Sequence, residues 1–448
     1  MTDVDPPRAS GTAAPEGRLG RLVALLPKGA TVIGISLGVQ GLTTYGFLII
    51  AARALGPARY SPFSVLWALT FVAAPGIFLP LEQEVGRAAS ARRVRGFGAG
   101  PLVVRAALVG GGMAAAVMVL AGAGSGPLIS RLFDGQGLLF LGFLVAMPSY
   151  AAYYLARGTV AGAGRFRAYA SILLIEGAVR VAAAAGLWIV GVRNAGVYSL
   201  AIAIPCLVAI AIVLPRQRGV AAHGPAAPWN EISVALGWLL TGALLSQLLL
   251  NVAPLAVQAL FSRGNPTAAG RVLNGLIIAR VPLFLFQGIQ AALMPKLAAD
   301  ATAGRMDDFR ATLRRLLILV AGLVVVSVVG MALLGPPLLQ ILFGHRFVPL
   351  GRLDLALLAL GSESMMAALV LAYACIALGG YRGAAMGWVA GTVGVVTALV
   401  ILPGSLLRVE MSFCVGVGAA CAVMAWALRR RMAGREAGNP PATPEAGA

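Results

Sequence analysis

Charged side chains inside long apolar stretches are the residues of this sequence best suited to chemistry. Arg180 and Arg280 each lie in such a stretch, and Glu176 precedes Arg180 by four residues. A guanidinium removed from water needs an acceptor, and its planar fork matches the oxygens of a carboxylate or a phosphate. Glu176 and Arg180 share one helix face in the favourable order for an ion pair. Either the pair is a neutralised structural element, or the glutamate restrains an arginine that faces an aqueous cavity.

Arg280 has no acidic residue three or four positions away. Pro282 should bend its helix, and Gln287 lies seven residues after Arg280 on the same face. One interpretation is a bond across helices, to Glu363 or to backbone carbonyls. We favour contact with an anion, because a guanidinium binds phosphate through two hydrogen bonds.

A polar stripe follows one face of the apolar stretch 232–261. Gln247, Asn251, Pro254 and Gln258 follow one another at intervals of four, three and four residues, the spacing of neighbours on one face of an α-helix. Hydrogen bonding between helices explains such a stripe, and so does the wall of a polar cavity. The sequence leaves both interpretations open.

The sequence carries neither the nucleotide-binding motif of ATP-driven motors nor the helical motif of zinc metalloproteases. It contains no Gly-x-x-x-x-Gly-Lys-Ser/Thr loop and no His-Glu-x-x-His. The four cysteines lie in apolar stretches without Cys-x-x-Cys spacing, and the only histidines, His223 and His345, lie in expected loops. We therefore expect neither an enzyme nor a metal or cofactor site, which leaves transport as the main functional class.

The composition indicates a polytopic membrane protein. Of the 448 residues, 59% are hydrophobic and only 11% are charged, and the mean hydropathy is +0.88. Soluble domains carry about 25% charged residues. The net charge of +19 could suggest nucleic acid as a partner. The arginines, however, stand in short connections between apolar stretches, which is typical of a protein oriented in a membrane and surrounded by lipid.

The hydropathy pattern predicts an all-α fold with twelve transmembrane helices. Each apolar stretch approaches or exceeds the roughly 20 residues that cross a bilayer. The predicted spans are 29–52, 61–81, 101–123, 137–156, 168–190, 195–214, 232–261, 268–294, 314–335, 353–378, 383–403 and 411–428.

The positions of the basic residues predict the orientation. Most of them fall in the segments that share a side with the N-terminus, which predicts a plasma-membrane protein with both termini in the cytoplasm. The segment 306–317 has helical charge spacing, and we expect it to lie along the cytoplasmic face.

The longest connection near the middle, 215–231, reads as a cytoplasmic linker and divides the spans six and six. It separates an N-lobe, 29–214, from a C-lobe, 232–428, between cytoplasmic tails 1–28 and 429–448 that we expect to be disordered. Each lobe begins and ends on the same side, so any internal repeat must be parallel.

Pairs of glycines four residues apart predict close contacts between helices. Such pairs occur at Gly34/Gly38, Gly158/Gly162 and Gly387/Gly391. A glycine lets two helix backbones approach closely.

One connection stands out at the expected outer side, Arg53-Ala-Leu-Gly-Pro-Ala-Arg-Tyr-Ser-Pro-Phe. Gly56 and Pro57 should break the helix, and Ser61-Pro62 should start the next one. The stretch resembles the signature between the first two helices of polysaccharide and O-antigen flippases, which belong to the multidrug/oligosaccharidyl-lipid/polysaccharide exporter superfamily, abbreviated MOP. Ser61 stands where that family usually has glycine.

Three later stretches are similar to the same family, in the same order. They are the segment from Ala269-Gly270 to Met294-Pro295-Lys296-Leu297, the turn Ile341-Leu342-Phe343-Gly344-His345-Arg346-Phe347, and the loop Ala377-Leu378-Gly379-Gly380-Tyr381-Arg382. In the first of them Arg271-Val272 replaces a context that usually contains tyrosine.

The resemblance implies two six-helix lobes in a V shape around a cavity, working by alternating access. It implies a lipid-linked saccharide as substrate, glycosyltransferases or a polymerase of the same pathway as partners, and a monomer. Cavity arginines would meet the phosphate, with Glu176, Gln247, Asn251, Gln258, Gln287 and Glu363 as further cavity candidates beside Arg180 and Arg280. For the signature residues Arg53, Gly56, Pro57 and Tyr60 we expect a structural lock or gate at the outer mouth. The alternatives are a cation-coupled drug or metabolite antiporter of the same fold and a non-transporting scaffold in envelope assembly.

Overall fold

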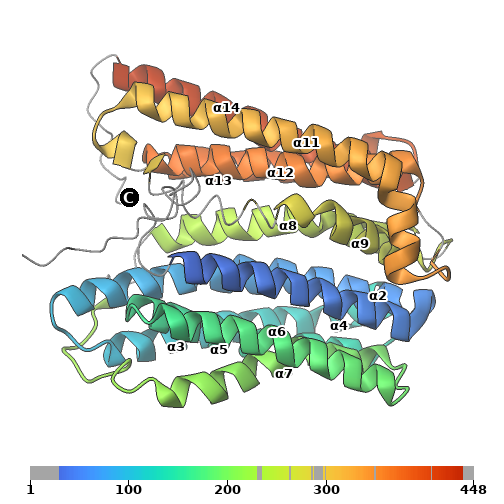
Figure 1. Cartoon of the computed structure of the whole chain (residues 1–448), viewed down its shortest axis with the longest axis horizontal. Coiled ribbons are helices and arrows are strands. Elements are labelled where there is room, and N and C mark those ends of the chain that lie inside the picture. The colour runs from blue at the N-terminus through green and yellow to red at the C-terminus, as the bar shows by residue number, and fades with distance from the viewer. Residues whose placement is uncertain are drawn as a thin grey trace, which may run out of the picture.

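The computed structural model describes most of the chain. The described residues are 30–229, 235–261, 264–283, 286, 296–297, 299–347, 350–404 and 406–436. The expected N-terminal tail and the candidate Gln287 lie outside them. Regular structure in the described residues is helical, which confirms the predicted all-α fold (Figure 1).

Two groups of helices lie side by side, one blue to green and one yellow to red in Figure 1. The N-lobe consists of α2 (Ala30–Val94), α3 (Gly100–Ala123), α4 (Ser125–Pro127), η1 (Leu128–Leu132), α5 (Gly137–Gly162), α6 (Phe166–Ile189), α7 (Ala195–Val213) and η2 (Leu214–Arg216). The C-lobe consists of α8 (Ala235–Phe261), α9 (Ala268–Ala279), α11 (Met306–Phe343), α12 (Arg352–Ala377), α13 (Tyr381–Ile401) and α14 (Leu406–Glu436). The lobes meet mainly along α2 and α8.

The helix α2 is a hairpin of two membrane-crossing arms. Gly56 leaves the helical conformation with φ 69° and ψ 169°, which a residue with a Cβ rarely adopts. Phe47 on the first arm packs against Phe63 and Trp67 on the second, with ring centroids 6.0 and 5.6 Å apart. The second arm begins at Pro57, so the expected start at Ser61-Pro62 was one turn too late. Proline fits the first helical position because its ring already fixes φ near the helical value.

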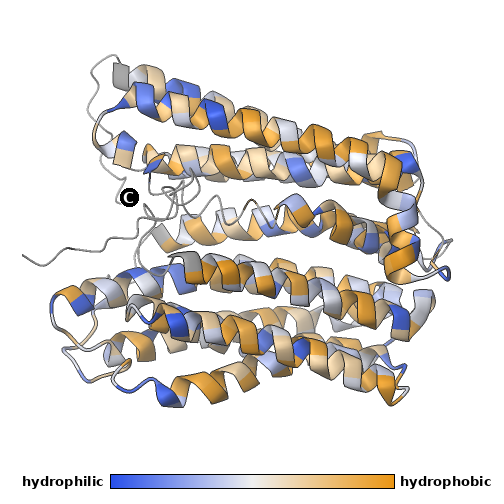
Figure 2. Ribbon diagram, viewed as in Figure 1, coloured by the Kyte–Doolittle hydropathy of each residue, from blue (hydrophilic) through white to orange (hydrophobic). Residues whose placement is uncertain are grey.

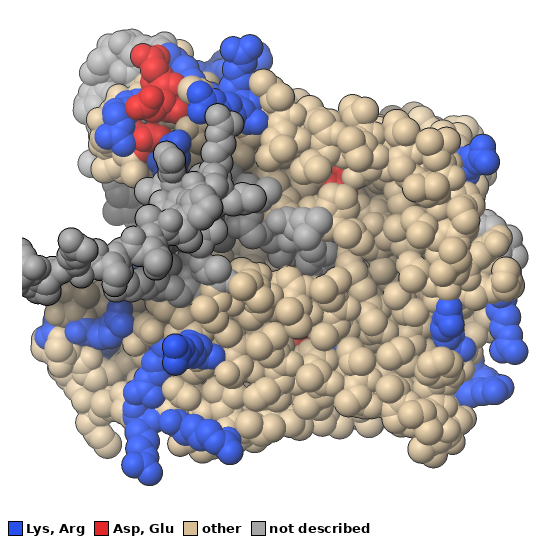
Figure 3. Space-filling model, in the orientation of Figure 1, with Lys and Arg blue, Asp and Glu red and all other residues tan. Residues whose placement is uncertain are grey.

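The length and polarity of the helices fit a lipid bilayer. Ten of the described helices are long and apolar enough to cross a membrane, and α2 accounts for two of the predicted spans. The eighth predicted span is described only in part, as the shorter apolar helix α9. Apolar residues dominate the middle of the molecule, and Lys and Arg gather toward its two ends (Figures 2 and 3).

The two ends of the helix bundle need names. The basic end is the one where most of the arginines lie, and it holds the starts of α3, α6, α8, α11 and α13 and the end of α14. The distal end is the opposite one and holds Gly56.

Several helices extend beyond their predicted spans, and two of these extensions change the interpretation of a segment. The segment 306–317, expected to lie along the membrane face, forms the first turns of α11, which continues to Phe343 as one helix. Asp307 and Asp308 in its first turn favour this start, and no proline or glycine separates the charged turns from the apolar ones. The helix α14 continues to Glu436, so residues 429–436, expected in the disordered tail, are helical.

The linker after α7 is fastened to the N-lobe. Arg92, which is buried, donates to the carbonyl oxygens of Pro225 and Ala226 at 3.0 and 3.2 Å. The guanidinium of Arg105 lies 4.8 Å from the centre of the Trp229 ring. These contacts give the connection between the lobes a defined path along the basic end.

Two of the three glycine pairs mark close helix contacts. A Cβ on Gly158 would lie 2.6 Å from the carbonyl oxygen of Glu82, and one on Gly387 would lie 2.3 Å from the Met424 side chain. These pairs confirm the prediction for α5 against α2 and for α13 against α14. For Gly34 and Gly38 the prediction was wrong, since a Cβ on either would meet nothing within 4 Å.

Gly158→Ala is expected to lower the free energy of unfolding by about 1–3 kcal/mol, because the methyl group would force apart the backbones of α5 and α2. Thermal unfolding in detergent measures the loss. Gly38→Ala is the matched control and should not destabilise the protein. Equal effects of the two substitutions would show that the close contact contributes nothing.

Candidate functional site

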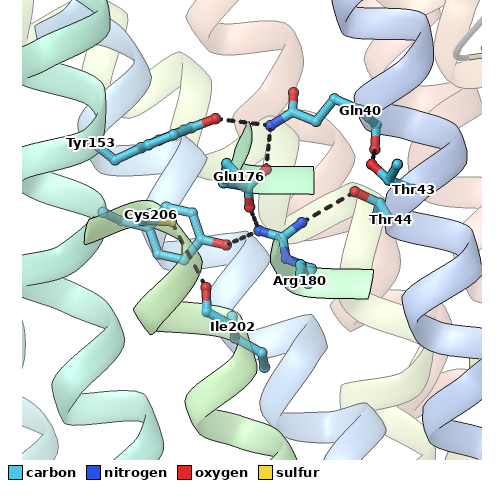
Figure 4. A network of polar contacts seen from close by, with 9 residues as sticks. Gln40, Thr43, Thr44, Tyr153, Glu176, Arg180, Ile202 and Cys206 are labelled. Carbon is cyan, nitrogen blue, oxygen red and sulfur yellow. Dashed lines mark hydrogen bonds and ion pairs between the residues drawn. The ribbon is translucent and has the colours of Figure 1, made fainter. Parts of the chain in front are cut away.

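Glu176 and Arg180 form the ion pair that their spacing predicts, in the interior of the N-lobe (Figure 4). Glu176 also accepts a hydrogen bond from the Gln40 amide at 3.1 Å, and that amide donates to the Tyr153 hydroxyl at 3.0 Å. The Arg180 guanidinium also donates to the hydroxyls of Thr44 and Tyr150, at 3.2 and 3.3 Å.

This network joins the first arm of α2 to α5 and α6, and its charged members are sealed from solvent. Glu176 is 0% exposed and Arg180 is 2% exposed. In this conformation Arg180 is paired with Glu176, which agrees with the interpretation of a neutralised ion pair. Its contact with an anion in a cavity stays a prediction.

A second buried cluster was missed by the sequence interpretation. The guanidinium of Arg157 lies 3.2 Å from the Glu82 carboxylate, and the Tyr169 hydroxyl donates to the same carboxylate at 2.9 Å. Arg157 also lies 5.0–5.2 Å from the ring centres of Tyr153, Tyr154 and Tyr169, within cation–π range. The predicted span 137–156 ends one residue before Arg157, but the spacing of Arg157 from Tyr153 and Tyr154, four and three residues, was an available signal.

Arg280 is held within the C-lobe by α8. It donates to the carbonyl oxygen of Leu250 and, at 3.3 Å, to the Asn251 side chain. Backbone carbonyls are thus among its partners, as one interpretation proposed. The Glu363 carboxylate, 0% exposed, has no hydrogen-bond partner among the described residues, so the predicted Arg280–Glu363 bond is not formed there.

A cavity of about 150 Å³ lies between the lobes toward the basic end. The second arm of α2 contributes Gln83 to its lining, and the C-lobe contributes Gln247 together with aromatic rings. The C-lobe aromatic residues that line it are Trp238, Tyr373, Tyr381 and Trp388. Of the predicted stripe on α8, only Gln247 reaches this cavity. Asn251 donates to the Gln247 carbonyl at 3.0 Å, and Gln258 lies at the distal end.

The distal end is closed by contacts between the lobes. The Nε of Arg53 donates to the carbonyl oxygen of Leu342 at 2.7 Å, and its Nη2 donates to that of Ile341, near the end of α11. Tyr60, fully buried, meets Phe347 edge to face with ring centroids 5.7 Å apart. We call these contacts the distal latch. It also includes the Gln258–Asp134 and Gly270–Ser61 hydrogen bonds described below.

Gln258 completes the distal latch by donating to the Asp134 carboxylate of the N-lobe at 3.0 Å. Partial burial raises the pKa of the Asp134 carboxyl above its ordinary value, and the hydrogen bond from Gln258 acts in the opposite sense. The Gly270 amide also donates to the Ser61 hydroxyl at 3.3 Å. The signature segment therefore supplies most of the N-lobe side of this junction.

The described residues contain no cluster of three or more His, Cys, Asp or Glu side chains that could hold a metal ion. The sequence-predicted candidates thus fall into separate places: an N-lobe ion pair, a C-lobe arginine held by α8, and a distal latch.

The fold is similar to those of solved MATE transporters. The inward-facing conformation of a multidrug resistance MATE family transporter of the MOP superfamily matches with a TM-score of 0.72 and 14% identity, covering 90% of this chain and 99% of that one. The outward-facing conformation of such a transporter matches with a TM-score of 0.65 and 14% identity, over 91% and 96%. A mutant of the Vibrio cholerae MATE transporter VcmN has a TM-score of 0.67 and 17% identity, over 93% and 98%.

Related sequences extend over most of the chain. An uncharacterized protein of Mycobacterium tuberculosis (strain ATCC 25618 / H37Rv) is 28% identical over 439 residues, covering 96% of each chain. A second one from the same strain is 25% identical over 415 residues, covering 88% of this chain and 90% of its own. No known family model matches the chain. The chain is therefore a multi-pass membrane protein with the fold of the MATE transporters.

Removing one member of the Glu176–Arg180 pair is expected to cost about 3–5 kcal/mol of unfolding free energy, because the other charge stays buried and uncompensated. Glu176→Met and Arg180→Met should each show this loss in detergent unfolding experiments. The double variant should be more stable than either single variant. Additive losses in the double variant would contradict the pairing.

Arg53→Ala should loosen the distal latch, since hydrogen bonds from a charged donor contribute about 1.5–3 kcal/mol. Spin labels at the exposed positions Ala58 and Leu353, in a background without the native cysteines, would report the separation of the lobes. A longer distance population is expected for Arg53→Ala. The control is Arg59→Ala, because Arg59 has no hydrogen bond or ion pair with the described residues. Identical distances in both variants would remove Arg53 from the latch.

Proposed function

We propose that the protein moves a lipid-linked saccharide across the plasma membrane by alternating access, with both termini in the cytoplasm. The observation that carries this proposal is the asymmetry between the two ends. The lobes are joined at the distal end by the latch, while the cavity between them lies toward the basic end. A protein that exposes its cavity to one side at a time needs this arrangement, with a closed end that can open when the lobes rotate.

The lining of the cavity supports a saccharide as the transported group. It combines the amides of Gln83 and Gln247 with indole and phenol rings. Amides donate and accept hydrogen bonds, and aromatic rings offer apolar faces beside polar tips, which suits a neutral molecule covered with hydroxyl groups. Because the cavity is smaller than the roughly 300–1000 Å³ of typical ligand sites, the lobes must open further to admit the substrate.

The phosphate of the carrier lipid would meet Arg280. The Asn251 side chain holds Arg280, and Asn251 stands one helical turn from the cavity residue Gln247. A phosphate could exchange with the Asn251 and Leu250 oxygens as the guanidinium's partner. Arg180 is a weaker candidate in this conformation, since Glu176 already neutralises it.

The antiporter alternative is less favoured by the same lining. A carboxylate would neutralise a cationic substrate most directly, and among the described residues no Asp or Glu side chain lines this cavity. The scaffold alternative predicts that deleting the tails abolishes function while cavity substitutions do not. Glycosyltransferases or a polymerase of the same pathway would supply or consume the lipid-linked saccharide, and the transporter would act as a monomer.

The proposal is tested by flipping of a fluorescent polyprenyl-diphosphate-linked saccharide in vesicles that contain the full chain. Gln247→Leu should slow flipping by up to about tenfold, the value of one lost hydrogen bond. Arg280→Gln should slow it by about 10- to 100-fold, the value of a lost charged contact. Thr241→Val is the control on the same helix, because Thr241 is exposed and, among the described residues, its hydroxyl bonds only to the Gly237 carbonyl.

Unfolding temperatures of all variants would separate lost transport from lost stability. Unchanged flipping in both Gln247→Leu and Arg280→Gln would overturn the assigned site. Efflux of cationic dyes without any flipping of the saccharide lipid would favour the antiporter instead.

A further inference from the structure

A recess of about 690 Å³ lies at the distal end, where the two lobes meet. Three arginines from separate segments line it: Arg53 from α2, Arg193 from the turn after α6, and Arg346 from the turn after α11. No Asp or Glu residue lines it among the described residues. This recess is distinct from the cavity between the lobes, which opens toward the other end.

The charges in the recess are poorly compensated by the protein. Arg193 and Arg346 are exposed and have no hydrogen bond or ion pair with the described residues. Arg53 donates hydrogen bonds from Nε and Nη2 to backbone carbonyl oxygens, which carry no net charge and do not neutralise the guanidinium. Like charges that share one recess repel each other, and a phosphate removes that repulsion while accepting bidentate hydrogen bonds.

The borders of the recess are apolar on both sides. On α6, the lining residue Trp188 is 47% exposed and is followed by Ile189 at 83%. On α11, the lining residue Ile341 is 67% exposed, and Leu334, two turns earlier, is 59% exposed. Exposed apolar side chains beside a tryptophan are typical of the level where lipid headgroups meet acyl chains. A phosphate in the recess would therefore have an apolar path for its hydrocarbon tail.

We propose that this recess binds the phosphate headgroup of an anionic lipid in the distal leaflet, with Arg53, Arg193 and Arg346 as the contacting residues. The predicted orientation places most basic residues at the opposite end, so arginines at this end are exceptions to it. Figure 3 shows Lys and Arg side chains at this end as well. Because the lining comes from both lobes, the bound phosphate joins them beside the distal latch. The proposal does not depend on which substrate the protein transports.

Native mass spectrometry of the purified full chain tests the site with two lipids of identical acyl chains, phosphatidylglycerol and phosphatidylcholine. The wild-type chain should retain phosphatidylglycerol preferentially. Arg193→Gln with Arg346→Gln should reduce its binding about tenfold, toward the level of phosphatidylcholine. The matched control, Arg59→Gln with Arg352→Gln, removes the same charge from exposed distal residues that do not line the recess, and it should keep the preference.

Three results would overturn the proposal. One is equal retention of both lipids by the wild-type chain, and another is equal loss of preference in the test and control variants, which would indicate general surface charge. The third is displacement of phosphatidylglycerol by inorganic phosphate at equal concentration, which would make the recess a site for free anions. The variant Arg193→Lys with Arg346→Lys keeps both charges and should retain part of the phosphatidylglycerol binding. The unfolding temperature of each double variant shows whether it is folded.

Discussion

A polar group that leaves water for an apolar interior must find its partner within the protein, and this constraint organises the molecule. Helices satisfy the backbone, and the buried charged contacts described above form inside single lobes. Glu176 with Arg180, and Glu82 with Arg157, unite helices of the N-lobe, while Arg280 is held by α8 within the C-lobe. Each lobe therefore keeps these charged contacts within itself.

Contacts between the lobes are of a different kind. Besides the packing of α2 against α8, the lobes are joined at the distal end by a few hydrogen bonds and one aromatic pair, made by Arg53, Tyr60, Ser61 and Gln258. Hydrogen bonds of this type can be exchanged for bonds to water, so opening the distal end costs far less than breaking a lobe. The hairpin at Gly56 places three of these residues within one short segment. The arginine, the turn and the tyrosine of this segment thus all lie at one junction between the lobes.

The closeness of α5 to α2 is a second requirement of the N-lobe. Gly158 and Gly162 allow the second arm of α2 to approach, and Glu82 of that arm then reaches Arg157 and Tyr169. Packing and electrostatics thus depend on the same two helices. A bulkier residue at Gly158 would separate the carboxylate from its guanidinium as well as the backbones.

What the sequence by itself determined is what depends on neighbours along the chain. Hydropathy over about 20 residues predicted the spans, and a spacing of four predicted the Glu176–Arg180 pair. Only the tertiary structure decided features that join distant segments: the Glu82–Arg157 contact, the difference between Gly34/Gly38 and Gly158/Gly162, and the three arginines of the distal recess. The physical reason is that helical periodicity states which residues share a face, whereas the partner of that face depends on how separate helices pack. For the same reason, the end at which the lobes are closed could be learned only from their contacts.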